Sequence, residues 1–203
     1  MQRFLTLLFV VTLSVSFSAS LATRALAQEV SEERRPVRLD RNHSTLGFRV
    51  PIVHGLGTVT GKFTDWSVDL FWDENDLDNS SVSVEIQTAS VDTGIDGRDS
   101  DLRSDSFFNS QVYPAITFTS SSISGGPFEY KVDGTFTMLG VSKNITLSLD
   151  VRSWSDSDDD DGWTAFRVNY TLDRTDYGMM WRHSSVDFFV GDNIATDIVL
   201  ITR

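Results

Sequence analysis

FEYKVDGTFTMLGVSKNITLSLDV, residues 128–151, alternates apolar and polar side chains in two runs with one break between them. Successive side chains of a β-strand point to opposite faces, so a period of two predicts strands with one apolar face each. The Leu139-Gly140 pair at the break has the chemistry of a tight turn. The stretch therefore predicts an antiparallel hairpin. The apolar positions of its first strand are Phe128, Tyr130, Val132, Phe136 and Met138.

The same period of two recurs along the rest of the chain. In TVTGKFTDWSVDLFW the register changes between Phe63 and Trp66, which predicts a bulge or bend near Thr64 and Asp65. Long one-faced strands with short turns predict an all-β fold, an antiparallel barrel of about eight strands, because closure removes exposed edges. The other alternating runs are TLGFRVPIV (45–53), VSVEIQT (82–88), TAFRVNYTL (164–172) and NIATDIVLIT (193–202).

One segment, GRDSDLRSDSFF at 97–108, departs from this pattern. Its glycine, aspartates and serines favour a helix start, and Leu102, Phe107 and Phe108 can turn one side inward. We predict a short helix or cap between two strands.

The N-terminal residues have the pattern of a cleaved secretory signal peptide, predicted here as residues 1–27. Arg3 precedes an apolar run, and Ala25-Leu26-Ala27 forms a small-residue cleavage site. Residues 28–36 are predicted to be a flexible lead-in. Residues 37–203 are predicted to form one domain, since the 203 − 27 = 176 residues left after cleavage suit a single core.

The charge balance restricts the classes of partner. The formal net charge is −12, and losing Arg3 and Arg24 with the signal peptide makes it −12 − 2 = −14. Such a surface repels nucleic acid and anionic membranes, so we expect no nucleic-acid partner. No second apolar run follows the signal region, so we expect no membrane span in the mature chain. This composition favours a neutral or apolar ligand.

Asp92-Thr93-Gly94 is the tripeptide that holds the catalytic carboxylate in aspartic proteases. Those enzymes need two such carboxylates, and this chain has one, directly after an alternating run. A strand-end turn therefore explains the tripeptide, because Asp, Thr and Gly all favour turns. A homodimeric protease that uses Asp92 is the alternative.

Metal sites have little support in the sequence. DSDDDDG at 156–162 has part of the spacing of a calcium loop, but its glycine falls one place late and position 12 is not Glu. A solvated turn is favoured for Asp156 to Asp161, with calcium binding left open. The histidines lack metal-ligand spacing, and Cys is absent, so there is no thiol nucleophile. We expect no catalytic residues, no metal and no cofactor.

Alternation alone leaves two interiors open. An eight-stranded barrel can pack solid, as a stress-response or interaction module without a ligand would, or it can hold one slender ligand. Aromatic side chains, which are frequent on the inward faces, suit either interior.

Several segments taken in order resemble the YceI-like family of bacterial periplasmic polyisoprenoid-binding proteins. The resemblance covers about residues 38–203 and is most specific in RDSDL (98–102), YPAITF (113–118) and GTFTMLGVSK (134–143). It implies a lipocalin-like barrel with a long apolar tunnel and a periplasmic location. It also implies non-enzymatic binding, transport or storage of a polyisoprenoid, an isoprenoid quinone or a related amphiphile, and chains that often pair as homodimers.

One position departs from the family. The family usually has His two residues after the Asp of its Arg-Asp pair, and Asp101 stands there in this chain. The head-group candidates near this position are Arg98, Asp99, Asp101 and Arg103. The alternative for Arg98 and Asp99 is that they pair with each other or cap the short helix.

Strand parity and the predicted cap together supply the expected ligand contacts. They are Phe48, Val50, Ile52, Phe63, Trp66, Val68, Val84, Ile86, Leu102, Phe107, Phe108, Phe118, Phe136, Met138, Leu147, Phe166, Val168 and Tyr170.

Overall fold

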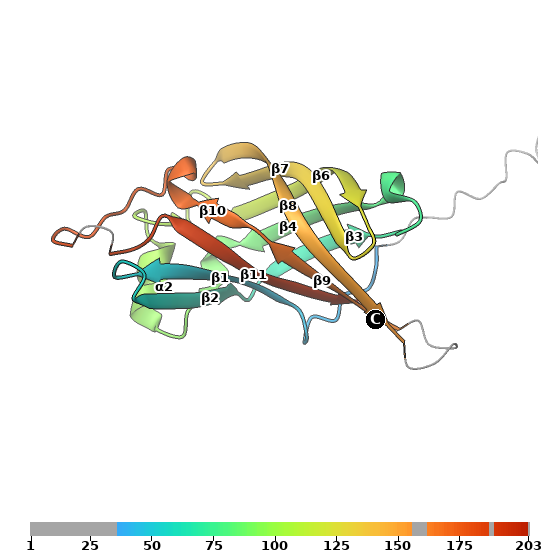
Figure 1. Cartoon of the computed structure of the whole chain (residues 1–203). Coiled ribbons are helices and arrows are strands. Elements are labelled where there is room, and N and C mark those ends of the chain that lie inside the picture. Colours follow the sequence, from blue (N-terminus) through green and yellow to red (C-terminus); the bar gives the residue numbers. More distant parts are fainter. Residues whose placement is uncertain (1–35, 156–161, 187–188, 203) are drawn as a thin grey trace, which may run out of the picture. The chain divides into compact units, whose positions relative to one another are not determined.

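An antiparallel β-sheet that curls round on itself makes up most of the structure, a computed structural model that describes residues 36–155, 162–186 and 189–202 (Figure 1). The sheet has 11 strands, and the all-β prediction is confirmed. The strands are β1 Thr45–Ile52, β2 Gly57–Phe63, β3 Trp66–Phe71, β4 Ser81–Gln87, β5 Val91–Asp92, β6 Ala115–Gly125, β7 Glu129–Met138, β8 Val141–Trp154, β9 Trp163–Asn169, β10 Thr171–Asp173 and β11 Asn193–Thr202. The helical segments are η1 Leu77–Asn79, η2 Thr88–Ser90, α2 Asp96–Arg103 and η3 Arg174–Tyr177.

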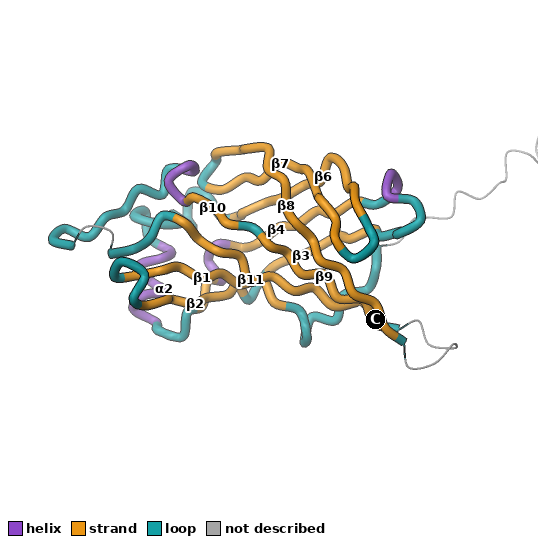
Figure 2. The backbone as a smooth tube through the Cα atoms, viewed as in Figure 1, coloured by secondary structure: helices purple, strands orange, loops and turns teal. Residues whose placement is uncertain are grey.

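The sheet has the order β3-β4-β6-β7-β8-β9-β11-β1-β2-β5, and β10 pairs with β11. Its two ends meet, because β2 leads directly into β3 and β4 leads through η2 into β5. Backbone hydrogen bonds join the ends there: the amide of Thr64 donates to the carbonyl of Ser90 (3.1 Å), and that of Gln87 donates to the carbonyl of Asp65 (3.0 Å). The curled sheet therefore encloses an interior, and Figure 2 shows the course of its strands as a backbone tube.

The strand number differs from the predicted eight because long runs are interrupted. The run through β2 and β3 breaks at Thr64 and Asp65, where the sequence predicts a bend. The run through β4 and β5 breaks at η2. The run through β9 and β10 breaks at Tyr170, whose amide donates to the side-chain oxygen of Thr196 (3.1 Å) instead of to a carbonyl.

The hairpin predicted from residues 128–151 is β7 and β8. Met138 pairs with Val141, which leaves a two-residue turn. Leu139 (φ 52°) and Gly140 (φ 75°) both have the positive φ that a type I′ turn requires, the turn type that matches the twist of paired strands.

Phe128 does not join the apolar face that its spacing predicts. It precedes β7, has a φ of 76° and is 58% exposed. The guanidinium of Arg152 lies 5.0 Å from the centre of its ring. Because of this positive φ, the side chain of Phe128 does not follow the alternation of the strand, which begins at Glu129.

Helix α2 falls within the segment predicted to form a helix or cap. It lies beside β1 and β2 at one end of the curled sheet, and β11 finishes at the other end (Figure 1). Residues 36–203 form one compact unit. The predicted signal peptide, the lead-in before Pro36 and the acidic segment Asp156 to Asp161 lie outside the described residues.

Candidate functional site

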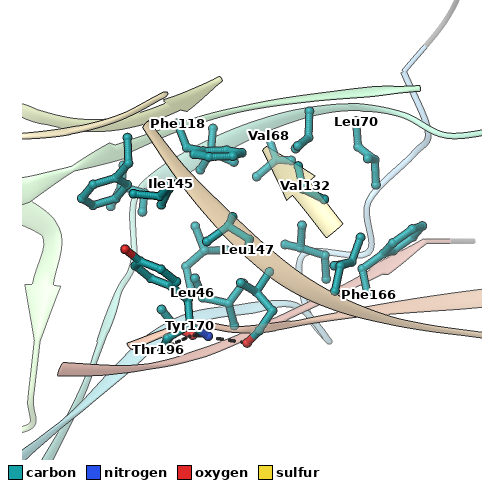
Figure 3. A pocket seen from close by; sticks show the side chains of 18 of the residues that line it. Leu46, Val68, Leu70, Phe118, Val132, Ile145, Leu147, Phe166, Tyr170 and Thr196 are labelled. Atoms are coloured by element: carbon teal, nitrogen blue, oxygen red, sulfur yellow. Dashed lines mark hydrogen bonds between the residues drawn. The ribbon is translucent and has the colours of Figure 1, made fainter. Parts of the chain in front are cut away.

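The interior of the sheet contains a deep cavity with an apolar wall (Figure 3). The space between its wall atoms amounts to about 920 Å³, counting the part open to solvent. In Figure 3, Leu70 and Phe166 lie at one end, while Phe118, Ile145 and Tyr170 lie toward the other. The wall residues are Leu46, Val68, Leu70, Trp72, Val82, Val84, Ile86, Ile116, Thr117, Phe118, Ile123, Val132, Phe136, Ile145, Leu147, Leu149, Phe166, Val168, Tyr170, Thr196, Ile198 and Leu200.

A middle cavity adjoins the deep one, and a mouth cavity adjoins the middle one. The middle cavity shares Leu46, Ile86, Ile116, Phe136, Thr196 and Ile198 with the deep cavity. It shares Phe48, Val50, Leu102, Phe107 and Val190 with the mouth cavity. These three adjoining cavities, called the apolar tunnel below, lead from the interior of the sheet to helix α2.

Glycines opposite aromatic rings help to keep the tunnel from being filled. A Cβ atom added at Gly61 would stand 2.4 Å from the ring of Phe48, and one at Gly134 would stand 2.5 Å from the ring of Phe118. Each ring therefore occupies the place where the neighbouring strand would otherwise carry a side chain. The rings lie along the wall instead of crossing the interior, and the space between opposite walls stays open.

Thr93 anchors helix α2 at the mouth. Its backbone amide and its hydroxyl both donate to Oδ1 of Asp99, at 2.9 and 2.5 Å. Nε of Arg98 donates to the Thr93 hydroxyl (2.7 Å), and Nη2 donates to the Thr93 carbonyl (2.9 Å). Thr93 thus links the side chains of Arg98 and Asp99, and the buried carboxylate of Asp99 helps to hold helix α2 in place.

The other two head-group candidates have different surroundings. Nη1 of Arg103 donates to the carbonyl of Val91 (3.4 Å), which ties the end of the helix to β5. Asp101 is exposed and lines the mouth cavity together with Arg98. Arg98 and Asp101 are therefore the candidates placed at the tunnel's opening.

Arg174, 1% exposed, holds the segment from Met179 to Trp181, whose last residue lines the mouth cavity. It forms an ion pair with Asp192 (2.9 Å) and lines the middle cavity. Burial lowers the pKa of Arg174, while the charge of Asp192 opposes that shift. Its guanidinium also donates to the carbonyls of Met179, Trp181, Val190 and Gly191.

This segment positions an aromatic side chain beside the mouth. The ring of Trp181 lies 5.3 Å from that of Phe107, and both residues line the mouth cavity. The pair combines one side chain from the segment after α2 with one from the segment that Arg174 holds. The rings of Phe107 and Trp181, which come from two different segments of the chain, therefore narrow the mouth.

Tyr170 is a polar group on the wall of the deep cavity. Burial raises the pKa of its phenol, the charge of Asp176 adds to the shift, and Lys143 opposes it. The phenol is therefore neutral at physiological pH, and the cavity wall carries no charge at this point.

The comparison with protein families concerns the part of the chain that forms the sheet and its cavities. A model of the YceI-like domain matches residues 38–201. This chain belongs to the YceI-like family. Protein YceI of Escherichia coli O6:H1 is 34% identical over 128 residues, which cover 63% of this chain and 64% of that protein. The chain thus matches just under two thirds of that relative's length.

Two solved structures share the YceI-like fold. BcnA of Burkholderia cenocepacia has a TM-score of 0.72 at 20% identity, covering 81% of this chain and 99% of that one. A polyisoprenoid binding domain from Saccharophagus degradans has a TM-score of 0.65 at 20% identity, covering 83% of this chain and 98% of that one. At this identity the likeness concerns the fold.

Most ligand contacts predicted for this YceI-like domain lie on the tunnel wall. Leu102, Phe107 and Phe108 from the predicted cap join side chains of the sheet there. Trp66 is the exception. It is buried at the bend after β2, and Arg41 covers its ring, with the guanidinium 4.0 Å from the ring centre. The predicted residues on the wall are Phe48, Val50, Ile52, Phe63, Val68, Val84, Ile86, Leu102, Phe107, Phe108, Phe118, Phe136, Met138, Leu147, Phe166, Val168 and Tyr170.

Other wall residues were missed by the sequence reasoning. Ile198 and Leu200 belong to an alternating run, so their parity could have found them. Trp72 follows β3 directly and continues the alternation of Val68 and Leu70. Arg174 and Trp181 carry no comparable signal, because long-range contacts place them at the mouth.

Asp92 of the YceI-like domain lies in a turn. Its backbone pairs with Lys62 at the end of β5, and its Oδ1 accepts a hydrogen bond from the amide of Gly94 (2.9 Å). Gly94 has a φ of 78°. This is the strand-end turn that the sequence favours for Asp92-Thr93-Gly94.

Two further findings concern only the part of the chain that the structure describes. There, three or more His, Cys, Asp or Glu side chains do not gather where they could hold a metal ion. The helices found in that part are all too short or too polar to cross a membrane. The acidic segment Asp156 to Asp161, for which a solvated turn is favoured and calcium binding is left open, lies outside this part of the chain.

Proposed function

We propose that this YceI-like domain binds one long apolar lipid chain, a polyisoprenoid or the tail of an isoprenoid quinone or related amphiphile, inside the apolar tunnel. The protein carries or stores the lipid and does not transform it. The observation that carries the proposal is the succession of three adjoining cavities from the interior of the sheet to the mouth, whose walls are mostly apolar and whose charged side chains are Arg174 in the middle and Arg98 and Asp101 at the mouth.

The physical basis is the hydrophobic effect. A polyisoprenoid chain exposes a large apolar area to water, and burying it is worth roughly 25 cal/mol per Å² before the cost of association and ordering is subtracted. Apolar walls achieve this without charged groups. A slender tunnel suits a chain better than a compact ligand, since it contacts the chain on all sides.

Polar groups at the mouth orient the lipid's head group. Arg98 and Asp101 border the mouth cavity, and we assign the head-group contact to them. Asp99 and Arg103 instead hold α2 in place through Thr93 and Val91. Asp101, an acceptor where the family usually has His, favours a head group that can donate a hydrogen bond, such as a hydroxyl.

Two observations support the class and place of action. The solved domain from Saccharophagus degradans, which shares the fold, is described as polyisoprenoid-binding. The N-terminal residues have the signal-peptide pattern, so we infer cleavage after Ala27 and action in the periplasm.

The test is binding of a purified isoprenoid quinone or polyprenyl alcohol, followed by native mass spectrometry of the protein after gentle purification. Ile198 lies where the deep and middle cavities share a wall. Ile198→Trp places a large ring in the tunnel and is expected to reduce the bound fraction at least tenfold.

Leu56→Trp is the matched control, because Leu56 is 89% exposed and lies outside the tunnel walls. It should bind as the unsubstituted protein does. The proposal is overturned when the unsubstituted protein takes up no isoprenoid lipid, or when Ile198→Trp folds cooperatively and binds with full affinity.

A further inference from the structure

The end of the deep cavity that lies away from the mouth is built from buried side chains. At this end of the deep cavity, Leu70, Phe166 and Leu200 are 3%, 2% and 6% exposed. Leu70 and Phe166 mark the end in Figure 3. These three side chains come from the end of β3, the middle of β9 and the end of β11.

Trp72 is the largest side chain at this end, and two rings clamp it. Its ring lies 4.8 Å from that of Tyr130, at an interplanar angle of 84°, and 5.2 Å from that of Phe166, at 80°. Both are edge-to-face contacts, a favourable geometry for aromatic pairs. Trp72 and Phe166 line the cavity, whereas Tyr130 does not. The indole cannot swing aside without losing both contacts.

The N-terminal segment backs this end of the sheet. The amide of Val37 donates to the carbonyl of Leu70 (2.7 Å), and Leu39 forms a bridge with Thr202. Val37 and Leu39 pack against the core. This end of the deep cavity, called its floor below, is therefore supported by Val37 and Leu39 as well as by the strands that form it.

We propose that Trp72 sets the length of the lipid chain that the tunnel accepts. This inference rests on the proposed function and deepens it. A chain shorter than the tunnel leaves unfilled apolar wall near Trp72, so each added isoprene unit raises affinity. Once the chain end touches the indole, further units stay at the mouth in water and add nothing. Affinity therefore rises with chain length to a limit that the Trp72 ring fixes.

The experiment uses a series of polyprenyl alcohols that differ only in the number of isoprene units, offered as an equimolar mixture. Native mass spectrometry of the full domain reports which lengths are bound. Trp72→Leu removes most of the floor and should increase the chain length at which affinity stops rising by at least one isoprene unit. Val132→Phe adds volume to the wall of the deep cavity and should move it down, because Val132 is 2% exposed and lines that cavity.

Trp154→Leu is the matched control, since it makes the same replacement at a 48% exposed tryptophan outside the tunnel walls. Its length preference should equal that of the unsubstituted protein. Thermal unfolding identifies any variant that fails to fold. If Trp72→Leu fails to fold, the result for Val132→Phe decides the test.

The outcomes separate this inference from the proposed function. If the unsubstituted protein binds no chain of any length, both are overturned. If it binds chains but the folded Trp72→Leu and Val132→Phe variants keep its length preference, the lipid-binding function stands and the role of Trp72 is refuted.

Discussion

The ring of Phe48 lies over Gly61 on the neighbouring strand, where an added Cβ atom would stand 2.4 Å from the ring. The two residues pair directly across β1 and β2. Phe48 lines both the middle cavity and the mouth cavity, so its ring position helps to set the width of the tunnel near its entrance.

Gly61→Ala should therefore narrow the tunnel. The three atoms nearest to the new methyl group belong to the side chains of Phe48 and Thr93, so we expect the ring to move inward while the strands stay paired. We expect lipid affinity to fall at least tenfold and stability to fall by about 1–3 kcal/mol. Calorimetric titration and chemical denaturation measure the two effects.

Gly97→Ala is the control for that substitution, because a Cβ there meets nothing within 4 Å. Gly97 lies in α2, where alanine should add about 0.5–1 kcal/mol of stability and leave binding unchanged. Equal affinities for the Gly61→Ala and Gly97→Ala proteins would contradict the role given to the ring of Phe48.

Thr93→Val should loosen α2 from the sheet. Valine has the shape of threonine but lacks the hydroxyl that donates to Asp99 and accepts from Arg98. Leaving a buried carboxylate short of a donor costs about 1–3 kcal/mol. Chemical denaturation and amide hydrogen exchange across α2 measure the loss. Thr93→Ser keeps the hydroxyl and should stay within about 1 kcal/mol of the unsubstituted protein; a loss as large as that of valine would point to the methyl group instead.

Arg174→Met should release the segments from Met179 to Trp181 and from Val190 to Asp192, which the guanidinium holds. The guanidinium pairs with Asp192 and binds several carbonyls, and removing one partner of a buried pair costs about 3–5 kcal/mol. Arg174→Lys should also destabilise the protein, because a single ammonium lacks the planar fork of donors. Thermal unfolding and amide exchange of residues 179–186 provide the measurements.

Arg182→Lys is the comparison for this pair. Arg182 also contacts Asp192 (2.8 Å), but its side chain is 46% exposed, so the change should cost no more than about 1 kcal/mol. Similar losses at positions 174 and 182 would show that burial of Arg174 is not what holds the segment.

The alkaline limit of stability should depend on Tyr177. Burial, followed by the nearby Tyr170 and Asp176, raises the pKa of Tyr177 from 10.0 to about 12. The neutral phenol is thus favoured in the folded protein. Its stabilising contribution is complete below pH 10 and is lost as the pH rises from 10 toward 12.

Tyr177→Phe keeps the edge-to-face contact with Phe136, whose ring centre lies 5.3 Å away, and removes the titrating group. Its stability should fall less steeply above pH 10 than that of the unsubstituted protein. Denaturation curves across this range provide the measurement, and parallel pH profiles for the two proteins would contradict the prediction.

Most of the ligand contacts predicted from strand parity lie on the tunnel wall, because side chains of one face must share one side of a sheet. The same reasoning misplaced Trp66 and Phe128. A bend before Trp66 and a positive φ at Phe128 take these residues out of the regular geometry on which parity depends. Asp99 was one of the head-group candidates, with pairing to Arg98 or capping of the helix as the alternative, and in the fold its carboxylate accepts hydrogen bonds from Thr93.

By itself the sequence determined most of the strands, the tight turn at Leu139-Gly140, the bend near Thr64 and the acidic, cysteine-free character of the chain. These are local properties, set by the period of the side chains and by the dihedral angles that each residue allows. Only the tertiary structure decided that the interior is hollow, that Trp72 closes it and that Arg174 holds its mouth. Whether a ring fills a space or lies along a wall depends on which residue the neighbouring strand places opposite it, as Gly61 is placed opposite Phe48.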